Sequence, residues 1–311
     1  MQLFSSLDST NADGAWLTIG SFDGVHRGHQ EIIRQLAAGA HAHTAPAVVL
    51  TFYPHPAVVL RGSNGPFYLS SPDERAEIIG SLGVDIVIIQ RFDRQLADTS
   101  ARDFIMELKE RLGLQQLLVG HDFTLGRKRE GDVPTLRRFG EELGFEVEVS
   151  QPVLLDGQVI SSSQIRSALT AGNVERALQL LGRSYRLTGE VVPGDGRGRT
   201  IGIPTANLKT WSEQLLPAVG VYACQVRIGE KVYRAATNIG VRPTFDRSTT
   251  FLHVEAHLLD FQGDLYGQKI QLDFLARLRG EQKFADVQAL VTQIQEDIAR
   301  TRQLVTQASP P

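Results

Sequence analysis

The first half of the chain is organised around the stretch Leu17–His29, which reads Leu-Thr-Ile-Gly-Ser-Phe-Asp-Gly-Val-His-Arg-Gly-His. A short apolar run ends in Gly-Ser, Asp23-Gly24 predicts a turn, and His26 and His29 begin a helical segment. Histidines at positions i and i+3 share one face of a helix. A helix that begins just after a strand directs free backbone N–H groups into the crevice at the sheet edge. The stretch therefore predicts an anion site, and phosphate is the obvious candidate.

Apolar runs of strand length alternate with helical patterns from Trp16 to about Val149. Strands are predicted at Trp16–Gly20, Ala47–Phe52, Asp85–Ile89, Gln116–Val119 and Phe145–Val149, and helices at His29–Ala38, Asp73–Leu82, Ser100–Leu112 and Val133–Leu143. Ser71-Pro72-Asp73-Glu74 is a capping box with proline at the first helical position, which supports one of these helix starts. We expect an α/β fold with a doubly wound parallel sheet and helices on both faces.

The pattern changes near Gly182, after a helical connecting region from Ser161 to Leu181. Beyond it, strands are predicted at Tyr185–Val192, Gly220–Ile228, Lys231–Ile239, Phe251–Leu259 and Lys269–Phe274. Strands without helices between them predict an antiparallel barrel or sandwich. A 3.6-residue period predicts one C-terminal helix and is carried by Phe284, Val287, Leu290, Val291, Ile294 and Ile298. We expect one domain over residues 1–182 and a second over residues 183–311.

Composition restricts the class of protein. The 311 residues suffice for about two domains, and 42% hydrophobic with 22% charged residues is typical of globular proteins. A net charge of -3 predicts no general attraction to nucleic acid or to an anionic membrane. The single Cys224 excludes an internal disulfide and a cysteine-based zinc site. Without a signal-peptide or membrane-spanning pattern, we expect a cytoplasmic protein, and the sequence does not set its oligomeric state.

Three further stretches of the first half carry reactive side chains: Thr51–Pro56 with Pro54, His55 and Pro56, Gly120–Gly126 with Asp122 and Phe123, and Ser161–Arg166. The first two follow predicted strands, so they should gather with the histidines at the carboxyl edge of the sheet. The serine run offers hydroxyls at a helix start, and Arg166 offers a planar fork for phosphate oxygens. Three alternatives stay open: a rigid turn at Pro54–Pro56, a plain helix cap at Ser161–Arg166, and a metal site at Asp23, His26 and His29.

No Walker A motif or complete Gly-x-Gly-x-x-Gly occurs in the chain. The early His26-Arg27-Gly28-His29 and the late serine run with Ile165-Arg166 instead resemble the nucleotidylyltransferase superfamily. The resemblance implies that the histidines stabilise charge on the α-phosphate of ATP while a substrate phosphate displaces pyrophosphate. Such a transfer relies mainly on positioning and electrostatic stabilisation, which agrees with a helix-start anion site.

The second half contains a glycine-dense stretch, Gly194–Leu208, and a polar position on an alternating strand. Glycines allow a backbone to approach a phosphate closely, although a tight β-connection also needs them. Thr205 and Asn207 lie at i and i+2, so an extended backbone would offer both oxygens to a nucleotide-bound Mg²⁺. Glu255, between His253 and His257, is either a solvated strand residue or the carboxylate that a kinase needs to accept a hydroxyl proton.

These residues, together with Gly220-Val221-Tyr222-Ala223, Asn238–Phe245 and Asp264–Gly267, resemble a riboflavin kinase domain. The order of both halves, from about Leu17 to Arg302, resembles the bacterial bifunctional riboflavin kinase/FAD synthetase family. The resemblance implies a six-stranded antiparallel barrel in the second domain. It also implies that riboflavin is phosphorylated to FMN and that FMN is adenylylated to FAD, with ATP and Mg²⁺ in both steps.

The resemblance also implies roles for individual residues. Glu255 would be the base toward the ribityl 5′-hydroxyl, and His26, His29 and Arg166 would act in adenylyl transfer. The remaining implied contacts are ATP at Gly20, Phe22, Asp23, Ser162 and Ser163, flavin at Pro54, His55, Pro56, Asp122 and Phe123, and the kinase substrates at Gly196, Gly198, Arg199, Gly202, Pro204, Thr205, Asn207, Asn238 and Arg242, with Mg²⁺ on Thr205 and Asn207. Leu125 and Ser163 depart from the Phe and Thr that are common in the family.

Two other functions fit parts of the pattern. One is an adenylyl- or cytidylyltransferase for another phosphate acceptor, in which the β domain only recognises a ligand; Thr205, Asn207 and Glu255 count against it. The other is a non-catalytic flavin- or RNA-binding protein. The intact His26, His29 and Glu255 oppose that function, and the net charge of -3 opposes general RNA binding.

Overall fold

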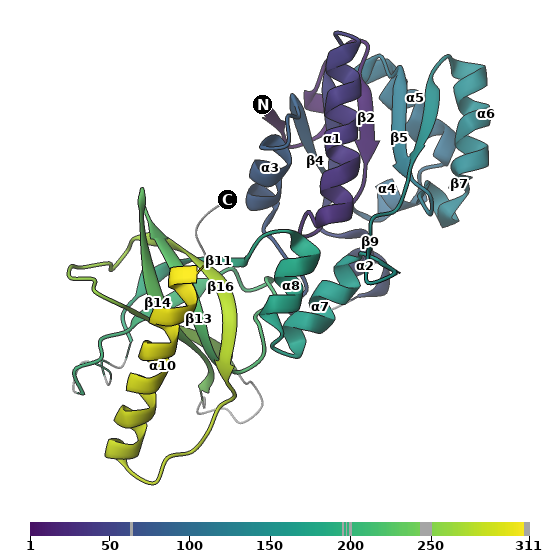
Figure 1. Ribbon diagram of the computed structural model, residues 1–311. Helices are drawn as coiled ribbons and strands as arrows, with labels where there is room; N and C mark the ends of the chain where they lie inside the picture. Colours follow the sequence, from purple (N-terminus) through teal and green to yellow (C-terminus); the bar gives the residue numbers. More distant parts are fainter. Residues whose placement is uncertain (63–64, 195, 197, 199–200, 243–250, 308–311) are drawn as a thin grey trace. The chain divides into compact units, whose positions relative to one another are not determined.

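The computed structural model describes residues 1–62, 65–194, 196, 198, 201–242 and 251–307. The chain divides into two compact units, one made of Met1–Gly65 and Ser70–Ser162 and the other of Pro66–Leu69 and Ser163–Pro311 (Figure 1). None of the helices in the described ranges is long and apolar enough to cross a membrane. The assignment of the two activities to residues 1–182 and 183–311 stays a prediction.

The first unit is built on a six-stranded parallel sheet with the order β1-β4-β3-β2-β5-β8. Its strands are β1 (Gln2–Phe4), β2 (Trp16–Ile19), β3 (Ala47–Tyr53), β4 (Ile86–Arg91), β5 (Gln116–Gly120) and β8 (Glu146–Ser150). The predicted parallel sheet is confirmed, with the short edge strand β1 as an addition. From β2 the chain goes to β3 on one side and later to β5 on the other. The topological switch therefore lies between β2 and β5, where open α/β folds bind ligands.

Helices cover both faces of this sheet, as predicted (Figure 1). The helices of this unit are η1 (Leu7–Ser9), α1 (Arg27–Ala42), α2 (Pro56–Arg61), α3 (Pro72–Gly80), α4 (Arg94–Asp98), α5 (Ala101–Leu112), η2 (Arg127–Arg129) and α6 (Val133–Leu143). The unit also contains four short strands: β6 (Thr124–Leu125), β7 (Gly131–Asp132), β9 (Leu154–Leu155) and β10 (Gln158–Val159). Alternate strand residues enter two apolar layers. Leu117 and Val119 pack with α5 and α6, whereas Leu118 between them packs with α1 and α3.

Two of the predicted helix starts are confirmed in atomic detail. The Ser71 side chain accepts the Glu74 N–H at 3.2 Å, and the Ser100 side chain accepts the Asp103 N–H at 3.1 Å. Each bond satisfies a backbone donor that has no partner within the helix. The short helices α2 and α4 were not predicted, because five or six residues show no clear helical period.

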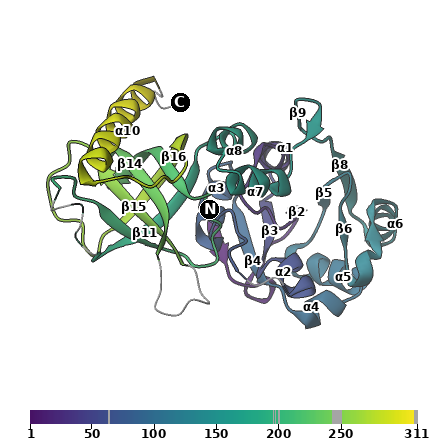
Figure 2. The same ribbon diagram turned by 90° about the horizontal axis from the view of Figure 1, so that it is seen from below.

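The second unit contains a closed antiparallel barrel with the strand order β11-β12-β15-β14-β13-β16. The elements are α7 (Ser162–Thr170), α8 (Val174–Leu181), β11 (Tyr185–Val192), β12 (Ala206–Thr210), β13 (Gly220–Ile228), β14 (Lys231–Arg242), β15 (Phe251–Leu258), β16 (Lys269–Arg279) and α10 (Val287–Gln307). Figure 2 shows α10 lying along the outside of this barrel, where it contacts β13, β14 and β16. The barrel alternative and the C-terminal helix are thus confirmed, and β12 is the sixth strand that our strand prediction lacked.

Candidate active sites

The loop from Gly20 to His26 connects β2 to α1 at the switch point. Phe22 and Val25 are buried and have φ values of 44° and 39°, a left-handed conformation that is strained for such side chains. Two hydrogen bonds hold the loop: Ser162 Oγ donates to the Asp23 carbonyl at 2.9 Å, and the Gly24 N–H donates to Ser70 Oγ at 3.3 Å. Strain of this kind persists where the surroundings fix the backbone, and it is frequent at functional sites.

The two histidines lie together at the start of α1, as predicted. His26 is the N-cap residue, and its Nδ1 accepts the backbone N–H of His29 at 3.3 Å. Its proton is therefore on Nε2 when the ring is neutral. The two imidazoles stack with centroids 3.5 Å apart and planes 18° apart, and the edge of His29 meets the Phe22 ring at 5.1 Å. Among the described residues, His29 Nδ1 is buried and has no hydrogen-bond partner.

The electrostatic environment keeps His29 neutral. Burial lowers its pKa well below the usual value, and the nearby His26 and Arg75 lower it further. A neutral imidazole still carries one N–H, so His29 can donate one hydrogen bond to an incoming phosphate oxygen. The free N–H groups of the first turn of α1 add a partial positive charge at the same place.

Two cavities of the first unit meet at these histidines. The larger has a volume of about 680 Å³ and an aromatic wall that includes Phe52, Phe92, Phe104 and Phe123. The smaller has about 360 Å³ and is lined by His26, Gly28 and Ser161, among others. The residues that line both are Ile19, Gly20, Phe22, His29, Asp122, Phe123 and Ser162. A ligand in each cavity would therefore meet its neighbour beside His29.

Most of the predicted ligand contacts of the first unit line these cavities. Asp23, His55 and Pro56 line the larger cavity, whereas Pro54 lines neither. His55 is the N-cap of α2, where its Nδ1 accepts the Ala57 N–H at 3.0 Å. His55 thus caps a helix at Pro54–Pro56, where the open alternative was a rigid turn, and it also lines the larger cavity.

Arg166 and Ser163 lie in the second unit, on helix α7. Arg166 Nε donates to the Phe67 carbonyl at 2.9 Å, and its guanidinium carbon lies 3.9 Å from the centre of the Phe67 ring. Phe67 is in turn held by its N–H, which donates to the Glu213 carbonyl at 2.8 Å. These contacts fix the Arg166 side chain, and its role toward ATP stays a prediction.

The barrel places Glu255 between two asparagines. Glu255 of β15 pairs in register with Asn207 of β12 on one side and with Asn238 of β14 on the other. Directly paired residues direct their side chains to the same face of a sheet, so these three side chains form one row. Val254 and Ala256 are buried on the opposite face. His253 Nε2 lies 3.5 Å from Glu255 Oε1, and a ring nitrogen of His257 lies 2.7 Å from the Pro204 carbonyl.

Two glycines of the glycine-dense stretch, Gly194 and Gly198, lie close to Asn207 and Thr205. A Cβ atom on Gly194 would lie 2.1 Å from Asn207 Nδ2, and one on Gly198 would lie 2.3 Å from the Ile203 carbonyl and 3.5 Å from Thr205 Oγ1. Gly196 and Gly202 have φ values of 69° and 77°, which favour glycine. Arg199 and the side chain of Arg242 lie outside the described residues. The glycines therefore allow the backbone to form a cradle around two oxygen-bearing side chains.

The second unit also has two cavities that share a residue. A cavity of about 600 Å³ lies between the outer barrel face and α10 and is lined by Glu255, Asn238, Arg279, Phe284, Val287 and Leu290, among others. A smaller one of about 120 Å³ is lined by Pro204, Phe261, Leu265 and Tyr266, among others. Thr205 lines both. A group passing from one cavity to the other would therefore pass this hydroxyl.

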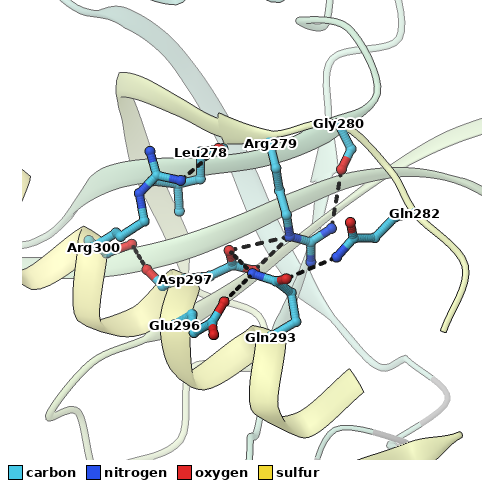
Figure 3. A network of polar contacts seen from close by, with 9 residues as sticks. Leu278, Arg279, Gly280, Gln282, Gln293, Glu296, Asp297 and Arg300 are labelled. Carbon is cyan, nitrogen blue, oxygen red and sulfur yellow. Dashed lines mark hydrogen bonds and ion pairs between the residues drawn. The ribbon is translucent and has the colours of Figure 1, made fainter. Parts of the chain in front are cut away.

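A polar network fastens α10 beside the larger of these two cavities (Figure 3). Arg279 Nε donates to both carboxylate oxygens of Asp297, at 3.0 and 3.3 Å, and Arg300 Nη1 donates to the Leu278 carbonyl at 3.0 Å. The Arg279 guanidinium also lies 5.6 Å from the centre of the Phe284 ring. Arg279, Asp297 and Phe284 line the cavity, and sequence reasoning missed all three as site residues. Phe284 is part of the predicted helical period but precedes α10, which begins at Val287.

These two sites define the class of protein: an enzyme with two separate centres, each suited to the transfer of a phosphate-containing group. Family models agree with this division. A model described as FAD synthetase matches residues 8–164, and a model described as riboflavin kinase matches residues 181–305.

Relatives match along nearly the whole chain. The bifunctional riboflavin kinase/FMN adenylyltransferase of Pseudomonas fluorescens is 40% identical over 98% of both chains. The protein of the same name from Escherichia coli K12 is 38% identical over 98% of this chain and 97% of its own. A crystal structure named as a macrolide-efflux protein from Streptococcus pneumoniae is similar with a TM-score of 0.87 and 32% identity, covering 96% of this chain and 98% of its own.

The chain belongs to the family of bifunctional riboflavin kinase/FMN adenylyltransferases. It phosphorylates riboflavin to FMN and adenylylates FMN to FAD, and both reactions depend on ATP. The family and the two activities predicted from the sequence are confirmed, and the single-activity and non-catalytic alternatives are excluded.

Proposed function

We propose that each unit performs one of the two reactions at the point where its two cavities share residues. The observation that carries this proposal is that His29 lines both cavities of the first unit and Thr205 lines both cavities of the second. Group transfer needs the donor phosphate and the acceptor in direct contact. In this proposal, adenylyl transfer belongs to residues 1–182, a range that contains the first unit and also α7 and α8, and the kinase reaction belongs to residues 183–311, which contain the barrel and α10.

For adenylyl transfer, ATP occupies the smaller cavity with its phosphates toward the start of α1. The flavin ring of FMN lies against the aromatic wall of the larger cavity, near His55, Pro56 and Asp122. An oxygen of the FMN phosphate then attacks the α-phosphorus of ATP, and the bond to pyrophosphate breaks. His26, His29 and the N–H groups of α1 stabilise the charge that develops. The roles of Ser162, Ser163, Arg166 and Pro54 follow from the family resemblance.

For the kinase reaction, riboflavin occupies the cavity under α10, with its ring near Phe284 and Leu290 and its ribityl end toward Glu255. Glu255 accepts the proton of the 5′-hydroxyl as that oxygen attacks the γ-phosphorus of ATP, and the bond to ADP breaks. The adenine end of ATP lies in the smaller cavity beside Pro204 and Tyr266. The cradle of Gly194, Gly196, Gly198 and Gly202 lies along the phosphates.

The residues present fit Mg²⁺ as the divalent ion of the kinase reaction. Thr205 and Asn207 offer neutral hard oxygens inside a glycine cradle that a Cβ atom would fill. In the described part of the chain, no three His, Cys, Asp or Glu side chains form a metal site by themselves. A bound ion would therefore share ATP oxygens and neutralise phosphate charge, as Mg²⁺ usually does. Cytoplasmic localisation and the absence of a nucleic-acid partner stay predictions.

The experiment that tests the proposal assays each reaction separately in the full-length chain. Riboflavin or FMN is incubated with ATP and Mg²⁺, and the flavins are resolved by chromatography. In Thr205→Val, we expect FMN formation to fall about a hundredfold because the shared oxygen is lost while side-chain volume is kept. We expect FMN conversion to FAD within twofold of the unaltered chain. If folded Thr205→Val loses both activities, or keeps both, the assignment is contradicted. Titration of ATP binding with and without Mg²⁺ tests the ion at Thr205 independently of turnover.

A further inference from the structure

Arg75 is a charged residue buried completely inside the first unit. It lies in the first turns of α3, and its side chain is 0% exposed. Removing a guanidinium from water costs several kcal/mol unless its surroundings compensate. Such a residue is rarely tolerated for packing alone, so its contacts should reveal what it does.

The contacts of Arg75 join two loops at the carboxyl edge of the sheet. Its Nη1 atom donates to the Ser21 carbonyl at 2.7 Å and to the Phe52 carbonyl at 3.0 Å. It also lies 3.1 Å from Thr51 Oγ1, and that hydroxyl donates to the Ser21 carbonyl at 3.0 Å. The end of β3 and the first loop residues after β2 are thus held by one nitrogen from α3.

The two loops held by Arg75 form part of the proposed adenylyl-transfer site. Ser21, Phe22 and Phe52 all line the larger cavity. Ser21 immediately precedes Phe22, whose φ of 44° shows where the loop is strained. A carbonyl fixed by two donors limits the freedom of the next peptide, so Arg75 and Thr51 help to keep the strained conformation. Arg75 itself does not line either cavity.

The charge of Arg75 also reaches the histidine pair. It is one of the causes that lower the pKa of His29, after burial and His26. A fixed positive charge in a water-poor interior favours an anion bound nearby, and it does not need to reorient during the reaction. The position of Arg75 thus serves the phosphate site in two ways.

We infer that Arg75 is a positioning residue for FMN adenylylation, which fixes the Ser21 and Phe52 carbonyls and thereby the loop that leads to His26 and His29. The inference rests on the adenylyl-transfer site proposed above. It adds a residue from α3 that no motif in the sequence pointed to. Its role is separate from substrate contact, so it should affect turnover more than substrate affinity.

The test compares Arg75→Met with Arg75→Lys in the full-length chain. A displacement of about 1 Å in a catalytic group can cost about a hundredfold in rate, so we expect kcat for FMN adenylylation to fall about a hundredfold in Arg75→Met. The KM values for FMN and ATP should stay within about threefold. Arg75→Lys restores a buried positive donor and should recover at least about tenfold. Thr51→Val removes the second donor to Ser21 and should lower kcat by about tenfold.

Controls separate positioning from general loss of structure. Riboflavin phosphorylation by the second unit should stay unchanged in all three variants. Leu112→Ala removes a fully buried core side chain of α5 away from the loop and provides a destabilised reference. If Leu112→Ala, matched for thermal stability, shows the same fall in kcat, the role of Arg75 is structural and the inference is wrong.

Three further results separate the inference from the proposal beneath it. An unchanged adenylylation rate in folded Arg75→Met overturns the role of Arg75 alone. An unchanged rate in His29→Asn shows that the site itself is misplaced, whatever Arg75 does. Equal rates in Arg75→Lys and Arg75→Met would show that the buried charge has no part in the reaction.

Discussion

In the proposed assignment both units transfer phosphate-containing groups from ATP, but only in the barrel does a carboxylate act as a base. In the barrel, Glu255 lies in a row with Asn207 and Asn238 beside the shared Thr205. In the α/β unit, the corresponding place holds His29 at a helix start, with a lowered pKa. The acceptors explain the difference. An alcohol must lose a proton to become a nucleophile, whereas the phosphate of FMN is already an anion near neutral pH.

The difference also determines how each site is built. A base needs one side chain at a defined position, and barrel register supplies it because three neighbouring strands align their residues. Charge stabilisation needs several donors that converge on one point, and a helix N-terminus after a strained loop supplies them. The unit that needs no base therefore depends more on loop conformation, and the unit that needs one depends more on strand pairing.

The strongest test of this comparison removes the carboxylate from each site. Glu255→Gln keeps the size of the side chain but cannot accept the hydroxyl proton, so FMN formation should fall by about 10²- to 10⁴-fold. Asp122 is a carboxylate that lines both cavities of the first unit. Asp122→Asn should lower kcat for FMN adenylylation by less than about tenfold, because no proton needs to be removed. Rates are measured separately with riboflavin and with FMN, and an equally severe loss in Asp122→Asn would end the comparison.

Sequence reasoning placed site residues well where they are close in sequence, and less well where they come from different strands. His26 and His29 lie on one helical turn, and Thr205 and Asn207 lie two residues apart, so their spacing already indicated that they would lie near each other. The Asn207–Glu255–Asn238 row joins three strands, and the motifs suggested its members without showing their register.

Residues without a local motif were missed. Arg279 and Asp297 are brought together by the docking of α10 on the barrel. Arg75 is in a short helix without a distinctive motif, and its role follows only from its burial and from its contacts with two loops. The strand β12 was missed because its alternation is short and follows the glycine-dense stretch. In each case the deciding interaction is tertiary, and no periodicity along the chain reports it.

A second prediction concerns how α10 shapes the riboflavin site. Asp297 is 2% exposed and holds Arg279 at the cavity, so Asp297→Asn should release the guanidinium and raise the KM for riboflavin about tenfold. The matched control is Asp260→Asn, because Asp260 pairs with Arg302 of the same helix at 2.7 and 2.8 Å on the exposed surface. Exposed pairs contribute little, so the control should change this KM by less than twofold. If both variants change the KM for riboflavin equally, the effect comes from the docking of α10 as a whole and not from the Arg279–Asp297 contact.

A third prediction concerns Leu125, where the family resemblance led us to expect phenylalanine. Leu125 is 9% exposed and lines the larger cavity of the first unit, close to Phe104 and Phe123 in the same apolar layer. Leu125→Phe adds aromatic contact area to the proposed flavin pocket, so the KM for FMN should fall about threefold with little change in kcat. Riboflavin phosphorylation should be unaffected. A rise in the KM for FMN would show instead that the smaller leucine is needed to leave space for the ring.

The smallest expected effect is a pH dependence of stability that belongs to the first unit alone. Because the pKa of His29 is lowered on folding, the unfolded chain binds more protons than the folded chain below the ordinary value of about 6.5. Stability from neutral His29 is therefore fully present above about pH 7 and falls as the pH decreases through 6.5 toward the folded pKa. Thermal unfolding at pH 7.5 and pH 5.5 should show a smaller loss of midpoint temperature in His29→Asn than in the unaltered chain. Glu255→Gln alters the other unit, so its midpoint temperature should fall between pH 7.5 and pH 5.5 as much as that of the unaltered chain. If all three proteins lose the same midpoint temperature, His29 is not held neutral by its site.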